Sequence, residues 1–129
     1  MYWTALKQMA VLLVTFAILD AIWLATTASI STSMIAAIQN KPLEIRWIPA
    51  IIVYILMVIA TWFFAVEPSK TVVEAAGRGA LLGFCMYGLY DLTNYATLSR
   101  YTLSFALTDI VWGTFLLGTA AAAATIAAK

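Results

Sequence analysis

The sequence predicts an all-α integral membrane protein, folded as a four-helix bundle. Of its 129 residues, 64% are hydrophobic and 10% are charged, whereas soluble domains are about half apolar and about a quarter charged. Each membrane span needs about 20 mostly apolar residues to cross a hydrocarbon core about 30 Å thick. Four apolar segments meet this need, so we expect one transmembrane domain over residues 1–129, with spans at about 4–27, 47–66, 71–98 and 102–126.

The first span begins close to the start of the sequence. Its apolar run is longer than the roughly 7–15 residues of a signal peptide's apolar region and contains Asp20, so we expect a retained helix rather than a cleaved signal. A polar stretch follows, yet apolar residues recur in it near helical spacing as far as Ile38. This pattern predicts that the helix continues, or bends, along the membrane interface. Asn40 and Pro42 are expected to end it.

The other spans have recognisable ends. Pro49 suits the first turn of the second span, where a backbone N–H would lack a helical partner anyway. Thr71 and Glu74 have the spacing of a capping box, in which each side chain binds the other residue's free N–H. Glu74 and Arg78 are also i,i+4 partners on the third span. The short link "SRYT" leads to the fourth span, which has an Ala-rich tail.

Four spans place both termini on one side of the membrane, here called the near side. The basic residues divide almost evenly between the two sides, so the positive-inside rule separates the orientations by little. We expect cytoplasmic termini and a location in a bacterial inner (cytoplasmic) membrane. Trp47 and Tyr101, at the far ends of their spans, fit an ordinary interfacial aromatic belt.

Two features of composition exclude whole classes of function. The sequence contains no histidine, which removes His-ligated haem, the usual zinc and di-iron sites, and Ser-His or Cys-His triads. Cys85 is the only cysteine, so an intramolecular disulfide or a thiolate metal cage cannot form. A net charge of +1 without a basic patch gives no reason to expect a nucleic-acid partner. We expect no cofactor and no bound metal.

Three aspartates lie inside apolar spans, where each carboxylate costs about 2.5–3.5 kcal/mol on insertion scales. At 1.5 Å per residue, Asp20, Asp91 and Asp109 each lie about 10 Å from the far end of a span. The same measure reaches Tyr54 in the second span, so every span contributes a polar group at one level. Clustered carboxyls in a low dielectric do not all ionise, which suits a site for a cation, a proton or the polar group of a lipid.

Local spacing on the third span supports an inward-facing cluster. Gly79 and Gly83 form a small-xxx-small pair that lets another helix approach closely. Steps of three and four residues continue this face through the polar part of the span. The face comprises Gly83, Tyr87, Tyr90, Asp91 and Asn94. We interpret "YDLTN" as the protein-facing stripe of the span.

An internal match relates the first and fourth spans. "FAILDAIWL" and "FALTDIVWG" share the pattern F-A-x-x-D-x-x-W. Aspartate and tryptophan three residues apart lie on one helix face, so the indole N–H of Trp23 or Trp112 can serve a nearby acceptor. The two spans run in opposite directions, and a true repeat would imply a local two-fold axis in the membrane plane. Ancestral duplication and chance both stay open.

The segments "LDAIWL", "GLYDLTNYATL" and "DIVWG" carry a resemblance to a known family. The sequence resembles a family of small four-helix membrane proteins described as a domain of unknown function, number twenty-one seventy-seven. The resemblance covers nearly the whole chain, and "YDLTNYAT" is its most specific part. It implies a multi-pass membrane protein and supplies no substrate, cofactor or mechanism.

Three functions stay open on the sequence. The first is binding of a lipid-like or cationic small molecule in an acidic pocket that opens to the far side. The second is a membrane-embedded enzyme using the same residues for acid–base chemistry on a lipid, with no catalytic residue singled out. The third is a structural subunit of a larger membrane assembly, in which the aspartates hold the helices in register. Membrane lipids are expected partners, and a homo-oligomer or an assembly partner fits too. The expected ligand-binding residues are Asp20, Trp23, Tyr54, Tyr87, Tyr90, Asp91, Asn94, Asp109 and Trp112.

Overall fold

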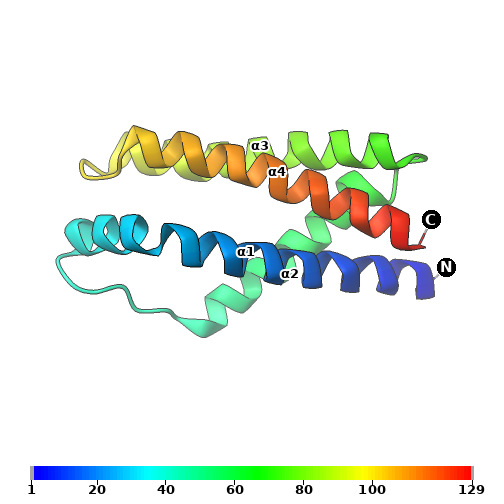
Figure 1. The fold of residues 1–129 in the computed structure, drawn as a ribbon, viewed down its shortest axis with the longest axis horizontal. Helices are drawn as coiled ribbons and strands as arrows, with labels where there is room; N and C mark the ends of the chain where they lie inside the picture. The colour runs from blue at the N-terminus through cyan, green and yellow to red at the C-terminus, as the bar shows by residue number, and fades with distance from the viewer. Residues whose placement is uncertain (1, 129) are drawn as a thin grey trace.

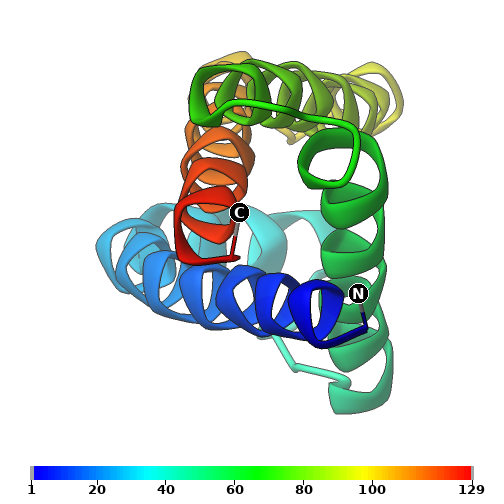
Figure 2. The same cartoon turned by 90° about the vertical axis from the view of Figure 1, so that its right-hand side faces the viewer.

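A computed structural model describes residues 2–128 of the chain. The helices are α1 (Tyr2–Gln39), α2 (Trp47–Thr61), the π-helical turn η1 (Trp62–Val66), α3 (Val72–Thr97) and α4 (Leu103–Ala128). No strand occurs among these residues. Both ends of the chain lie at one end of the bundle (Figure 1), and the helices surround a common centre in the order α1, α2, α3, α4 (Figure 2). The predicted all-α four-helix class is confirmed.

α1 is one continuous helix of 38 residues, which at 1.5 Å per residue is about 57 Å long. It therefore runs on through the polar stretch after the first apolar run, as the spacing predicts. Asn40 follows it with a φ of 58°, the left-handed conformation that commonly ends helices. The continuation is held by packing, because Met34 forms a small core with Tyr101 and Ala106.

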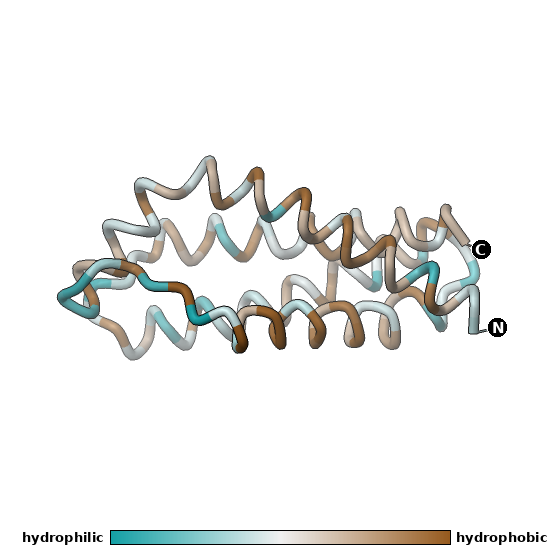
Figure 3. Tube along the Cα trace, turned by 90° about the horizontal axis from the view of Figure 1, so that it is seen from below, coloured by the Kyte–Doolittle hydropathy of each residue, from teal (hydrophilic) through white to brown (hydrophobic). Residues whose placement is uncertain are grey.

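Three helical segments are long and apolar enough to cross a membrane among the described residues: Tyr2–Gln39, Trp47–Val66 and Leu103–Ala128. Most of α2 is strongly hydrophobic, and hydrophilic residues gather in the linker before it (Figure 3). α3 has 26 residues, so its length suffices, but its glycines and polar stripe lower its hydropathy. A span at 71–98 therefore stays a prediction, and α3 would cross only in the company of the other helices.

The tightest helix pair is α3 with α4, whose contact is the most extensive in the bundle. A Cβ added at Gly79 would lie 2.8 Å from the Ala121 Cβ, and one at Gly83 would lie 2.8 Å from the Gly113 carbonyl carbon. The two backbones thus approach each other as the small-xxx-small spacing allows. The main core lies in the near half and joins Leu12 of α1 to residues of α2, η1, α3 and α4.

The start of α3 carries the predicted cap in a modified form. The Glu74 N–H donates to Thr71 Oγ1 at 3.0 Å, and Glu74 pairs with Arg78 at 3.3 Å, both as expected. The return bond differs, since the Glu74 carboxylate accepts from the N–H of Lys70 at 3.0 Å rather than from that of Thr71. The carboxylate reaches one residue further back and still satisfies a free backbone donor.

Replacing the capping residue, Thr71→Ala, is expected to lower the free energy of unfolding by about 1 kcal/mol, because the Glu74 N–H loses its acceptor. The measurement is the midpoint of SDS-induced unfolding in mixed micelles. Thr71→Ser, which keeps the hydroxyl, is the matched control and should stay close to wild type. Equal losses in both variants would contradict the capping role.

Candidate functional site

A groove of about 480 Å³ lies in the far half of the bundle and is lined from all four helices. This volume falls within the range of about 300–1,000 Å³ that is typical of small-molecule sites. Seven of the nine expected ligand-binding residues line it: Asp20, Trp23, Tyr54, Tyr87, Tyr90, Asp109 and Trp112. The other two, Asp91 and Asn94, lie outside its lining. The structure thus brings most of the predicted residues to one space.

Asp20 on α1 ties three helices together at one wall of the groove. Tyr54 of α2 donates its hydroxyl to Asp20 Oδ2 at 2.6 Å, and Trp112 of α4 donates its indole N–H to Oδ1 at 3.1 Å. Asp20 is 9% exposed. Each oxygen of this carboxyl therefore accepts one hydrogen bond, and a narrow part of the group still faces the groove.

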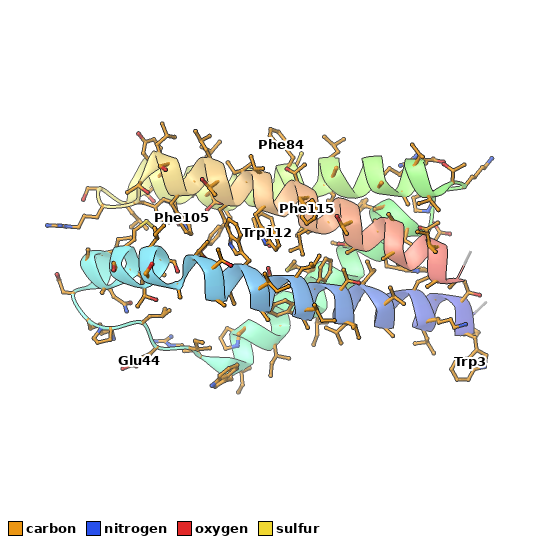
Figure 4. The ribbon with its side chains drawn as sticks, in the orientation of Figure 1. Trp3, Glu44, Phe84, Phe105, Trp112 and Phe115 are labelled. Atoms are coloured by element: carbon orange, nitrogen blue, oxygen red, sulfur yellow. The ribbon has the colours of Figure 1, made fainter. Side chains whose placement is uncertain are left out.

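The two Asp-Trp motifs interlock. The rings of Trp23 and Trp112 stack with centroids 4.7 Å apart and planes 5° from parallel. Trp112 donates a hydrogen bond to Asp20, while Trp23 lies close enough to the carboxyl of Asp109 to interact with it, so each tryptophan is a neighbour of the aspartate of the other motif. Figure 4 shows Trp112 reaching from α4 toward α1. This exchange is the arrangement that a local two-fold relation between α1 and α4 would produce.

Asp91 forms a second acidic layer behind the groove. It is fully buried, and Oδ1 accepts a hydrogen bond of 2.5 Å from the Tyr101 hydroxyl. Within residues 2–128, Oδ2 is buried without a hydrogen-bond partner, and the carboxyl of Asp109 interacts with that of Asp91. Asp91 and Asp109 therefore bring two carboxyls together in the interior of the bundle.

Tyr101 corrects one sequence interpretation. The sequence predicts it in an aromatic belt at the membrane interface, but it is 6% exposed and folds back from the link between α3 and α4 onto Asp91. Burial and the hydrogen bond to Asp91 raise the pKa of Tyr101 well above its ordinary value, so the phenol stays a donor. Asn94 interacts with Tyr90 and Tyr101. It therefore contacts residues of the groove wall without lining the groove itself.

Sequence reasoning also missed part of the groove wall on α1. Thr27, Ser31 and Met34 line the groove beyond the first apolar run. A signal for them was present, because they continue the face of Asp20 and Trp23 at steps of three and four residues. Tyr101 had no such signal, since helical spacing does not extend into a loop.

The acids are close without forming a metal-binding group. Within the described part of the chain, no three side chains among Cys, Asp and Glu are placed to hold a metal ion. Asp109 faces the groove next to Asp91, and Asp20 lies on the α1 side of the same space. None of the residues that line the groove is basic. The groove therefore places its carboxyls beside aromatic and apolar side chains without a basic partner in its lining.

A family model described as "Predicted membrane protein (DUF2177)" matches residues 5–126. The match covers nearly the whole chain and includes every residue that lines the groove. No curated protein and no solved structure matches the chain. The comparisons therefore identify a membrane protein family but no activity. Any inference about chemistry depends on the geometry of the site.

Proposed function

The chain belongs to this DUF2177 family of predicted membrane proteins, and we propose that it binds a small molecule bearing a cationic group at the acidic wall of the groove. One observation carries the proposal. Asp20 and Asp109, from two different helices, face one groove that has no basic residue in its lining. A carboxyl in a membrane span is costly, and a bound cation would offset this cost.

The aromatic lining supports a cationic ligand. Trp23, Trp112 and four tyrosines line the groove together with the two carboxyls, and the faces of such rings attract cations within about 6 Å. A purely structural role explains less. Interhelical polar contacts average about 0.6 kcal/mol in one measured membrane protein, far below the cost of burying a carboxylate at this depth.

The groove is proposed to open toward the far side. Its lining includes Leu43 from the linker and Ala50 from the first turn of α2, and this linker runs through the half of the bundle opposite the termini (Figure 1). The main core fills the near half. A ligand would therefore enter from the far end or from the surrounding lipid, and the site would be a closed pocket rather than a pore.

The test is native mass spectrometry of the protein extracted gently from its own membrane. We expect a discrete bound mass on the wild type and its loss from Asp20→Asn, because an amide carries no charge and can accept only one of the two hydrogen bonds. A fall in occupancy that reflects about a tenfold weaker affinity, or about 1.4 kcal/mol, is expected.

Glu44→Gln is the matched control, since Glu44 is exposed in the linker and does not line the groove (Figure 4). It loses the same charge and should keep the ligand. Asp109→Asn should behave like Asp20→Asn if both carboxyls hold the cation. A wild-type protomer without any bound small molecule, or full retention in the Asp20, Asp91 and Asp109 variants alike, would refute the proposal.

The pairing of Asp91 with Asp109 favours one alternative, acid–base chemistry on a membrane lipid. A buried carboxyl beside a second one that faces the ligand is an arrangement in which one group donates a proton and the other accepts it. Lipid profiles of cells with the wild type, with Asp109→Asn and without the protein would separate the two functions. Only an enzyme would change the mass or the isomer content of a lipid.

A further inference from the structure

A second cavity adjoins the groove. It measures about 360 Å³, and it lies between α2 and α3. Four residues line both spaces: Val53, Tyr87, Tyr90 and Asp109. The two spaces therefore meet beside the carboxyl of Asp109.

The cavity between α2 and α3 differs from the groove in chemistry. Its remaining lining residues are Met57 and Met86, and Asp109 is the only acid in its lining. Methionine side chains are flexible and polarizable, so they adapt to apolar partners of varied shape. This wall suits an alkyl chain and offers nothing to a second charged group.

The cavity is also open sideways, toward the lipid. Val53 is 51% exposed and Tyr90 is 61% exposed, whereas Met57 beneath them is 6% exposed. α2 and α3 touch each other far less than α3 and α4 do. A hydrocarbon chain from the bilayer could therefore lie between α2 and α3 while its polar end reaches Asp109.

We propose that the ligand is a single-chain cationic amphiphile, with its headgroup in the groove between Asp20 and Asp109 and its alkyl chain between α2 and α3 against Met57 and Met86. This inference rests on the proposed function and adds the class of ligand. A chain leaving lipid for protein gains little from the hydrophobic effect, so close packing must supply the preference. Filling the space beside Met86 should therefore remove that preference.

The test uses the full chain in nanodiscs of phosphatidylcholine, a lipid without net charge, with tritiated butylamine and tritiated dodecylamine as probes. Binding to empty nanodiscs is subtracted. Met86→Trp fills the cavity between α2 and α3 from a residue that does not line the groove. We expect about a tenfold loss of affinity for dodecylamine and less than about a threefold change for butylamine.

Leu81→Trp is the matched control, because Leu81 is 65% exposed on another face of α3 and lines neither space. It should leave both affinities unchanged. Met86→Phe makes a smaller change in the same direction, and it serves if Met86→Trp does not fold. The inference requires that the Met86 variant used, Trp or Phe, leaves the affinity for butylamine nearly unchanged.

The outcomes separate the two proposals. If neither amine binds above empty nanodiscs, or if Asp20→Asn, Asp91→Asn and Asp109→Asn all leave both affinities unchanged, the proposed function fails, and the proposed alkyl-chain site between α2 and α3 fails with it. If the amines bind and depend on these carboxyls, but folded Met86 variants lower both affinities equally or neither, the proposed function stands. The amphiphile inference is then wrong.

Discussion

Gly83→Val is expected to lower the free energy of unfolding by about 3 kcal/mol, because it forces α3 and α4 apart. A Cβ at this position would collide with the carbonyl oxygen of Gly113 and lie 3.1 Å from the Cβ of Leu117. The nearest obstacle is backbone, which cannot rotate away as a side chain can. The helices must separate, and the pair that separates is the tightest one in the bundle.

Gly88→Ala is the matched control on the same helix. No atom of the described residues lies within 4 Å of a Cβ at Gly88, apart from its own helix and chain neighbours. Alanine is a better helix former than glycine by about 1 kcal/mol, so this variant should equal or exceed the wild type. SDS-induced unfolding of both variants gives the comparison. If the unfolding midpoint of Gly83→Val were at or above that of Gly88→Ala, the α3 and α4 backbones would not be in close contact at Gly83.

The close approach at α3 shows what sequence can and cannot predict. The spacing of Gly79 and Gly83 indicates a face where another helix comes near, and the structure has that contact. The spacing does not identify the partner. The partner is α4, whose Gly113 and Ala121 present little side chain to α3, and such pairing of distant segments depends on the whole bundle.

The candidate site was predictable to the extent that helical geometry determines it. The rise per residue places Asp20 and Tyr54 at one level, and the structure has a bond of 2.6 Å between them. Rise alone does not determine how each helix is rotated, so the exchange of partners between the two Asp-Trp motifs was not foreseen. Tyr101 was missed because its position depends on the path of a loop.

Hydropathy explains why α3, predicted from the sequence as a span, is not among the three segments apolar enough to cross a membrane. α3 is less apolar than the three segments that meet the requirements for a span, because its inward face carries Asp91 and Asn94 together with several tyrosines and glycines. A sequence window averages the lipid-facing and protein-facing sides of a helix. The polar side of α3 faces the inside of the bundle, where Asp91 is fully buried, and an average over the whole helix does not record which side faces lipid.

Tyr101→Phe is expected to lower the free energy of unfolding by about 1–3 kcal/mol, because it leaves a buried carboxyl oxygen without its donor. Oδ1 of Asp91 would lose the bond of 2.5 Å from Tyr101, while Oδ2 is already without a donor among the described residues. Tyr95→Phe, which removes a hydroxyl from a tyrosine that is 44% exposed on α3, is the matched control and should change little.

A double-mutant cycle assigns the loss to Asp91. With Asp91→Leu in place no carboxyl is left unsatisfied at this position, so adding Tyr101→Phe should cost much less than it does in the wild type. The expected coupling is about 1–2 kcal/mol, within the range for residues in direct contact. The ring of Tyr101 also packs edge-on against Phe105, with centroids 5.7 Å apart, and Tyr101→Phe keeps this packing. An equal cost of Tyr101→Phe in both backgrounds would therefore mean that the hydroxyl stabilises the protein through another contact and that its bond to Asp91 contributes little.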